Sequence, residues 1–246
     1  MHLFRLIPIR VITLIACMGA MLSVLADIYS GYSSGIHVSS FSLTFLDVKQ
    51  FGLAKSLRHL EIGQCIAFIS FPLSCLSIIP IYQGIKNSKF KILKNIFVLS
   101  FILSFVLGLA FHSLITYISC AFVKEQQGLL VLSQSEIDNM ANLFEVILKA
   151  SVLSSLVSFA CFSVIVFRSS TIFSKIAVIF NPLLLAVIII VVSLNVPAPL
   201  APFLYIVAGN LGVLIWYTLL FKPLVIRDQN TTVSQNIFAS TVNLSN

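Results

Sequence analysis

The residues of this chain that could do chemistry are a few ionisable and amide side chains set in otherwise apolar sequence. Glu145 and Lys149 stand four residues apart with the acid first, so on a helix they share a face and can pair. Asn142 lies about one turn earlier on the same face. Two readings stay open: the pair neutralises itself as a structural element, or it is a gated ion pair in a substrate or proton path.

His112 is the second candidate. A lone histidine in apolar sequence can relay protons, or it can be a neutral, hydrogen-bonded contact between helices. Haem or metal would require further ligands at the same depth, and His2, His37 and His59 all lie outside the apolar runs. The 5 cysteines fall within those runs and form no CxxC pair, so buried thiols are expected. We therefore expect no catalytic residue, no metal and no cofactor.

The elements that must position these residues are long apolar runs separated by short polar breaks. Each run is long enough to cross a hydrocarbon layer of about 30 Å, which takes about 20 helical residues. Inside lipid only a helix or a closed barrel satisfies its own backbone. The sequence therefore predicts an all-α fold, a polytopic membrane bundle of six transmembrane helices. The predicted spans lie near residues 8–28, 62–83, 96–122, 141–167, 173–194 and 200–221.

Composition supports one membrane domain over residues 1–228. Of the 246 residues, 59% are hydrophobic and 9% are charged, against about 25% charged in soluble domains. The net charge of +7 does not indicate a nucleic-acid partner, because the Lys and Arg residues are scattered among loops rather than gathered on one face. The polar stretch 229–246, rich in Asn, Ser and Thr, is expected to be a disordered tail.

The distribution of Lys and Arg predicts the orientation in the membrane. Ten of them fall in one set of alternating segments and four in the opposite set, and positively charged loops stay on the cytoplasmic side. Both termini are therefore predicted to be cytoplasmic, in a membrane expected to be the bacterial inner membrane. The ten are Arg5, Arg10, Lys86, Lys89, Lys91, Lys94, Arg168, Lys175, Lys222 and Arg227.

The connections predict further local features. Segment 30–60 is the longest, and its apolar-rich second half indicates an outer loop with a short interfacial helix. In the second outer loop, 124–139, Ser135 is expected to cap a helix that begins around Glu136. Trp216 and Tyr217, near the inner end of the last run, are expected to anchor that helix at the membrane interface.

With this topology, most of the intramembrane polar residues fall toward the outer side. Asn210 lies near mid-depth of the last run, and Asn181 precedes Pro182 in the inner half of the fifth. A polar cavity open to the outer face and floored near Asn210 would satisfy them, whereas the alternative is ordinary crowding of polar residues at helix ends. The candidate set is Asp27, Glu61, Gln64, His112, Asn142, Glu145, Lys149, Asn181 and Asn210.

Five short motifs stand out at 26–32, 111–113, 181–183, 196–199 and 209–212, with the sequences ADIYSGY, FHS, NPL, VPAP and GNLG. Together they resemble a family of uncharacterised bacterial six-span integral membrane proteins. The resemblance implies the fold and the membrane location, and it carries no activity. It also implies that Asp27, His112, Asn181 and Asn210 form a shared polar set.

Three classes of function fit these observations. The expected one is binding or transport of a small molecule or lipid through the outward-facing polar cavity, with membrane lipids and a small-molecule ligand as partners. The second is a structural or assembly subunit, which would need only lipid-facing and helix-facing surfaces. A membrane-embedded enzyme is the least favoured, because the sequence contains no HExxH, GxSxG or aspartate-rich motif.

Overall fold

The structure is a computed structural model that describes residues 8–33 and 43–243, with residues 222–243 described by their backbone alone. All regular structure in these residues is helical, which confirms the all-α class. The elements are α1 (Ile9–Gly31), α2 (Phe45–Leu53), α3 (Leu57–Cys75), α4 (Ile78–Ile85), α5 (Lys91–Gln126), α6 (Gln134–Arg168), α7 (Lys175–Ile179), α8 (Pro182–Ser193) and α9 (Leu200–Asn243).

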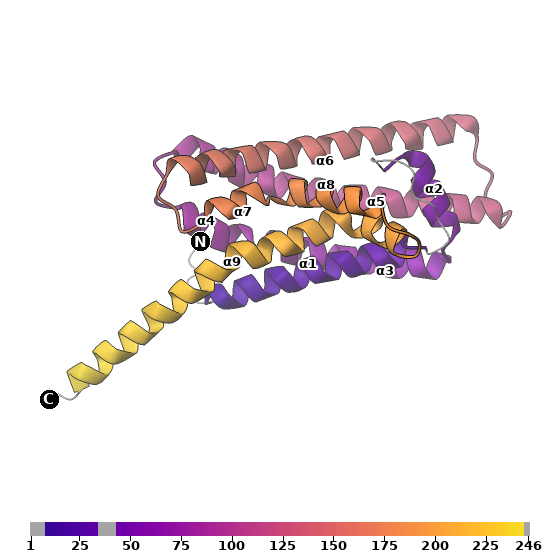
Figure 1. Cartoon of the computed structure of the whole chain (residues 1–246). Coiled ribbons are helices and arrows are strands. Elements are labelled where there is room, and N and C mark those ends of the chain that lie inside the picture. The colour runs from indigo at the N-terminus through magenta and orange to yellow at the C-terminus, as the bar shows by residue number, and fades with distance from the viewer. Residues whose placement is uncertain (1–7, 34–42, 244–246) are drawn as a thin grey trace.

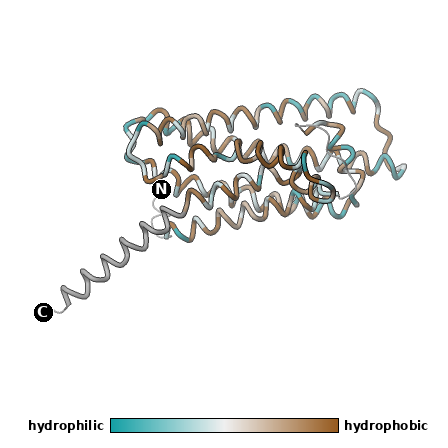
Figure 2. Tube along the Cα trace, in the orientation of Figure 1, coloured by the Kyte–Doolittle hydropathy of each residue, from teal (hydrophilic) through white to brown (hydrophobic). Residues whose placement is uncertain are grey.

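Five helical segments of the described chain are long and apolar enough to cross a membrane. They are α1, the α3–α4 stretch, α5, α6 and the part of α9 up to Phe221. Apolar residues dominate along these segments, while polar residues concentrate toward their ends (Figure 2). The long apolar helices expected from composition are therefore present.

The run predicted as a span over 173–194 is not one continuous helix. It is divided into α7 and α8, and α8 has only 12 residues, or about 18 Å of helix. Asn181 causes the break: its Oδ1 accepts a hydrogen bond from the Leu184 amide at 3.1 Å, so Asn181 is the N-cap of α8. Pro182 follows at the first helical position, where its missing N–H costs nothing.

The helices lie side by side, and the start of α1 and the end of α9 are at the same end of the molecule (Figure 1). α1 packs on α3 and on α9, α8 packs on α9, and α5 packs on α6. The α5–α6 pair joins the remaining long helices mainly through the contact of α5 with α3. α6 itself packs on α5 and α7, and the rings of Phe159 and Phe162 pack against Trp216 of α9.

A proline bends the second apolar segment and creates a polar contact in the core. Pro72 has no N–H for the helical ladder, and α3 ends three residues later, before α4 begins. At the break between α3 and α4 the Ser74 carbonyl accepts from the Ser77 amide at 3.1 Å and from the Tyr217 hydroxyl at 2.9 Å, while Ser77 Oγ lies 2.6 Å from that hydroxyl. This contact joins α9 to the α3–α4 bend.

Trp216 and Tyr217 lie in the largest hydrophobic cluster, so the prediction that they are interface anchors is wrong. Both are fully buried, beside Phe97, Phe101 and Phe162. Their polar atoms have partners inside the bundle: Trp216 Nε1 donates to the Ala177 carbonyl at 2.8 Å. An aromatic residue with a satisfied N–H or O–H is as stable in a core as at an interface.

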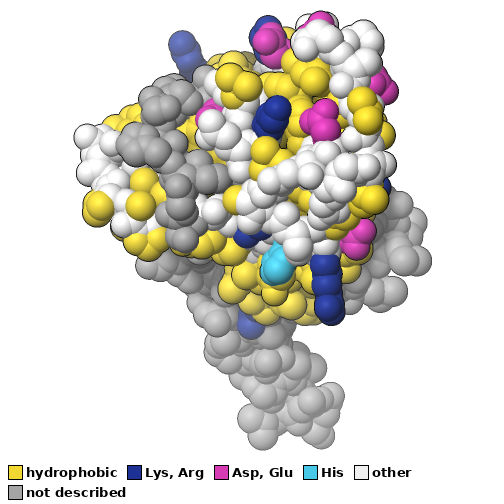
Figure 3. All heavy atoms as spheres, turned by 90° about the vertical axis from the view of Figure 1, so that its right-hand side faces the viewer, with side chains coloured by type: hydrophobic (Ala, Val, Ile, Leu, Met, Phe, Trp, Pro, Cys, Tyr) yellow, Lys and Arg dark blue, Asp and Glu magenta, His cyan; other side chains and the backbone are white. Residues whose placement is uncertain are grey.

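The end of the molecule opposite the termini carries α2 and the turn between α5 and α6. A short helix is present where the sequence predicts one, and Val48 of α2 packs in a cluster with Phe122 and Phe144. α6 begins with a capping box formed by Ser133 and Glu136, so Ser133 caps it rather than Ser135. Acidic and basic side chains are both scattered among apolar ones on the surface seen from this end (Figure 3).

α9 continues as a helix well past the bundle (Figure 1). Its backbone is helical to Asn243, so it includes most of the stretch for which the sequence predicts a disordered tail, 229–246. Residues 224–243 contain neither proline nor glycine. Each added residue therefore extends an existing hydrogen-bonded ladder without a new nucleation step.

Candidate functional site

Polar side chains from four helices, buried or half-buried, form a chain of contacts inside the bundle. Asp27 of α1 accepts a hydrogen bond at its Oδ2 from Asn210 Nδ2 of α9, at 2.8 Å. The other carboxylate oxygen of Asp27 lies 3.7 Å from Nε2 of His112 in α5. His112 Nδ1 in turn lies 3.3 Å from Oε1 of Gln64 in α3. The structure therefore brings together four of the residues that the sequence singles out; we call these four residues the polar network.

Serine side chains complete the polar network on either side of His112. Ser30 Oγ is 3.3 Å from His112 Nε2, and Gln64 Nε2 donates to Ser113 Oγ at 2.7 Å. α1 and α3 can approach closely here because Gly63 faces Ser30: a Cβ on Gly63 would lie 3.0 Å from the Ser30 backbone nitrogen. The glycine thus permits the helix spacing at which Asp27, His112 and Gln64 meet.

The network is nearly shielded from solvent. The side chains of His112 and Asp27 are only 7% and 13% exposed. Burial of a charge is costly unless the charge is paired and hydrogen-bonded, and a carboxylate with an imidazole and an amide donor beside it meets that condition. The arrangement can therefore hold a proton or a polar group in the interior of the bundle.

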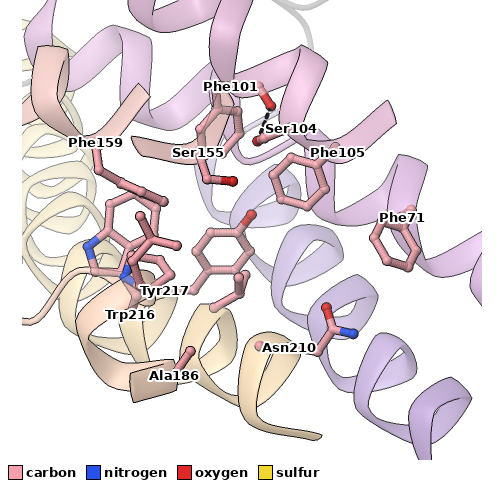
Figure 4. A pocket seen from close by; sticks show the side chains of 14 residues that line it. Phe71, Phe101, Ser104, Phe105, Ser155, Phe159, Ala186, Asn210, Trp216 and Tyr217 are labelled. Carbon is pink, nitrogen blue, oxygen red and sulfur yellow. Dashed lines mark hydrogen bonds between the residues drawn. The ribbon is translucent and has the colours of Figure 1, made fainter. Parts of the chain in front are cut away.

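A cavity of about 180 Å³ adjoins the polar network between the α5–α6 pair and the α8–α9 pair. Its wall is mostly apolar and aromatic (Figure 4). Phe159 and Trp216 lie toward one side of the cavity, and Phe71 and Asn210 lie toward the other (Figure 4). The remaining lining residues are Phe101, Ser104, Phe105, Ser155, Pro182, Leu183, Ala186, Gly209, Val213 and Tyr217.

Two residues belong to both the cavity and the network. Asn210 lines the cavity while its amide donates to Asp27. Phe71 lines the cavity and packs edge-on against the His112 ring, with the ring centroids 6.2 Å apart. The cavity is thus an apolar space with a polar group at one edge, which differs from the polar-walled cavity that the sequence suggests.

The aromatic lining residues were missed by the sequence reasoning. Phe101, Phe159 and Trp216 are ordinary apolar residues of transmembrane runs, and their helical spacing indicates packing alone. A signal was present only for α9, where small Gly209 adjoins Asn210 in an otherwise bulky run. A Cβ on Gly209 would meet no atom within 4 Å, which is consistent with open space beside it.

The other predicted site residues lie elsewhere. Lys149 Nζ donates to Glu145 Oε2 at 2.7 Å, and their side chains are 75% and 64% exposed, so this pair faces outward from the bundle. Asn142 and Glu61 are exposed as well. Asn181 caps α8, and its Nδ2 donates to the Val178 carbonyl at 3.3 Å. The structure brings none of these five side chains into hydrogen-bonding contact with the polar network.

No group of three or more His, Cys, Asp and Glu side chains is placed to hold a metal ion within the part of the chain that the structure describes. The five cysteines, all of which are described, are free thiols. The chemistry available at the polar network is therefore hydrogen bonding and proton exchange by Asp27 and His112.

Long apolar helices around a buried polar network define an integral membrane protein of the helical class. Within that class, the chain belongs to a family of unknown function, DUF6796, whose model matches residues 5–226. The expected membership of a family without an assigned activity is thus confirmed. No curated protein and no solved structure matches the chain.

Proposed function

We propose that this protein binds a small amphiphilic molecule, such as a single-chain lipid, in the cavity between α5–α6 and α8–α9. The polar end of the ligand hydrogen-bonds to Asn210, and its apolar body lies among the aromatic side chains. The observation that carries the proposal is Asn210, which is at once part of the cavity wall and part of the polar network.

The size of the cavity suits part of an alkyl chain better than a whole drug-sized molecule. An apolar cavity of about 150 Å³ holds benzene, while ligand pockets usually measure about 300–1,000 Å³. A cavity of about 180 Å³ therefore suits several carbons of an acyl or alkyl chain. The rest of the ligand would extend outside the cavity.

The packing of the helices supports entry from the side. α6 reaches α9 through the rings of Phe159 and Phe162, which pack on Trp216, whereas its backbone shares few close contacts with α8, although residues of both helices line the cavity. We therefore place the entrance at the boundary between α6 and α8. A molecule dissolved in the bilayer would reach the cavity through this boundary without passing through water.

We infer that α7 and α8 together make a sixth crossing, with both termini cytoplasmic in a bacterial inner membrane. The start of α1 and the end of α9 lie at the same end of the molecule, which an even number of crossings requires (Figure 1). Lys91, Arg168 and Lys175 begin or end helices at that end, and Arg10 is the second residue of α1. A helix interrupted at Asn181 is tolerated in lipid where its free backbone groups are capped, as Asn181 caps those of α8.

Trp216 provides a direct test of ligand binding. It is the sole tryptophan of the chain and it lines the cavity. A terminally brominated long-chain primary alcohol quenches tryptophan fluorescence on contact, so titration into detergent-solubilised protein should give saturable quenching. Ala186→Leu and Gly209→Leu, which fill the cavity from α8 and α9, should weaken this binding at least about tenfold, or about 1.4 kcal/mol.

Thr218→Leu is the matched control, because residue 218 is an exposed position on α9 outside the cavity lining. This variant should bind the brominated alcohol like the parent protein. Quenching that rises in proportion to the probe without saturation, equally in all four proteins, would show mere partition into the detergent and would overturn the proposal.

A further inference from the structure

The hydrogen positions in the network can be assigned from the hydroxyl groups on either side of His112. Ser113 donates its hydrogen to the Leu109 carbonyl at 2.9 Å, so Gln64 must be the donor in its contact with Ser113. This fixes the Gln64 amide with its Oε1 toward His112 Nδ1. The Nδ1 atom of His112 therefore carries a hydrogen.

The other ring nitrogen also faces acceptors. Ser30 donates its hydrogen to the Ala26 carbonyl at 2.7 Å, which leaves Ser30 Oγ as an acceptor toward His112 Nε2. The second neighbour of Nε2 is the Asp27 carboxylate. An imidazole with acceptors at both nitrogens is fully satisfied only when both carry hydrogens, which is the cationic form. One proton is thus shared by His112 and Asp27.

We propose that the Asp27–His112 pair is a proton-binding site linked to the ligand cavity through Asn210. This inference rests on the proposed function and names the ion that accompanies the ligand. With the proton bound, His112 neutralises Asp27 and the Asn210 amide is free to turn to the polar end of a ligand. Without the proton, Asp27 is an unneutralised buried charge that holds Asn210 in a charge-assisted hydrogen bond.

Asp27 and the ligand compete for the Asn210 amide, and this competition sets the direction of the linkage between proton binding and ligand binding. Ligand affinity is greatest when the pair is protonated, and it falls as the pH rises and the pair loses its proton. By reciprocity, ligand binding takes up a proton at the pair. If the pair binds one proton together with the ligand, the affinity for the ligand falls by up to about tenfold for each pH unit above the point at which the pair releases that proton.

Other titratable groups surround the pair. Lys55, before α3, donates to the Ile28 carbonyl at 3.4 Å, and His59 of α3 stacks on Tyr29 of α1. Glu61 of α3 is exposed, and Tyr205 of α9 is buried against Phe51. Of these, Glu61 is the acidic residue nearest to Gln64 in sequence, so Glu61→Gln is the matched control for removal of a carboxylate.

The test measures the dissociation constant of the brominated primary alcohol from Trp216 quenching at a series of pH values between about pH 5 and pH 9, on both sides of neutrality. The alcohol has no ionisable group in this range, so any pH dependence belongs to the protein. The parent and Glu61→Gln should lose affinity as the pH rises, up to about tenfold per unit. The double variant Asp27→Asn/His112→Gln, which has no titratable group left at the pair, should bind without pH dependence.

A second measurement needs only the parent protein, in case the double variant does not fold. Addition of the alcohol to weakly buffered protein containing an indicator dye should take up as much as one proton per molecule bound. Saturable quenching that is independent of pH and takes up no proton overturns the proton site while the proposed function stands. Absence of saturable quenching at every pH overturns the proposed function itself.

Discussion

At the scale of single residues, partner geometry separates candidates that sequence alone treats alike. Asp27, His112 and Asn210 are drawn from α1, α5 and α9, and each is buried or half-buried with a polar partner from another helix. Glu145 and Lys149 have each other as partners on one helix and need no other element. The contacts of Asp27, His112 and Asn210 join different helices, whereas the Glu145–Lys149 pair lies on the surface of α6 alone.

The exposure of the Glu145–Lys149 pair leads to a prediction about stability. Glu145→Gln, Lys149→Met and the double variant should all melt within replicate scatter of the parent in detergent. The reason is that an exposed ion pair adds little to stability, since both side chains remain solvated when either is removed.

The corresponding comparison is Asn210→Leu, which leaves the buried Asp27 carboxylate without its amide donor and should lower the melting temperature clearly. If both single charge variants instead melt well below the parent while the double variant does not, the pair is neutralised in an apolar environment and is structural after all.

At the scale of elements, two glycines of α9 three residues apart face different surroundings. A Cβ on Gly212 would lie 2.8 Å from the Pro182 carbonyl oxygen of α8, whereas a Cβ on Gly209 would meet nothing within 4 Å. The first glycine permits the close α8–α9 contact, and the second adjoins the cavity.

This difference predicts opposite effects of the same substitution. Gly209→Ala should raise the melting temperature, because alanine favours a helix over glycine by about 0.5–1 kcal/mol. Gly212→Ala should lower it, because overpacking against a backbone atom costs about 1–3 kcal/mol. Thermal unfolding of the two purified variants beside the parent measures both. A rise of similar size in both would mean that α8 is free to move away from Gly212.

The elements could largely be predicted from the sequence, and the site only in part. Apolar run length fixes α1, α5 and α6, because a membrane helix must be both long and apolar. The sequence predicts one span over 173–194, although an Asn followed by Pro is a recognisable helix start at which α8 in fact begins. The direction that Glu145 faces could not be read, because a membrane helix is apolar on all sides and its sequence carries little sign of which face is buried.

At the scale of the whole molecule, the two ends differ in charge. Among the residues with described side chains, the acidic ones at the surface lie between Asp47 and Glu145 in the sequence, in or near the outer connections of the predicted topology. The basic residues Arg10, Lys91, Arg168 and Lys175 mark the opposite end. Such an asymmetry orients a membrane protein through its Lys and Arg residues, with the acids contributing little.

The orientation is tested with reporter fusions in cells. A reporter that is active only outside the cytoplasm should be silent when fused at the C-terminus and active when inserted in the turn between α5 and α6, around Gln127. A cytoplasmic reporter at the same two positions is the control and should give the reverse result. Activity of the external reporter at the C-terminus would place the positive end of the bundle outside.

The lengths of α5 and α6 have a practical consequence. They contain 36 and 35 residues, so each measures about 52–54 Å, whereas the hydrocarbon layer is only about 30 Å thick. With the predicted orientation, we expect the surplus at the end that carries α2 and the capped start of α6. A protein of 246 residues is small for single-particle electron microscopy. An antibody fragment bound to the parts of these two helices beyond the lipid would add rigid mass to the particle.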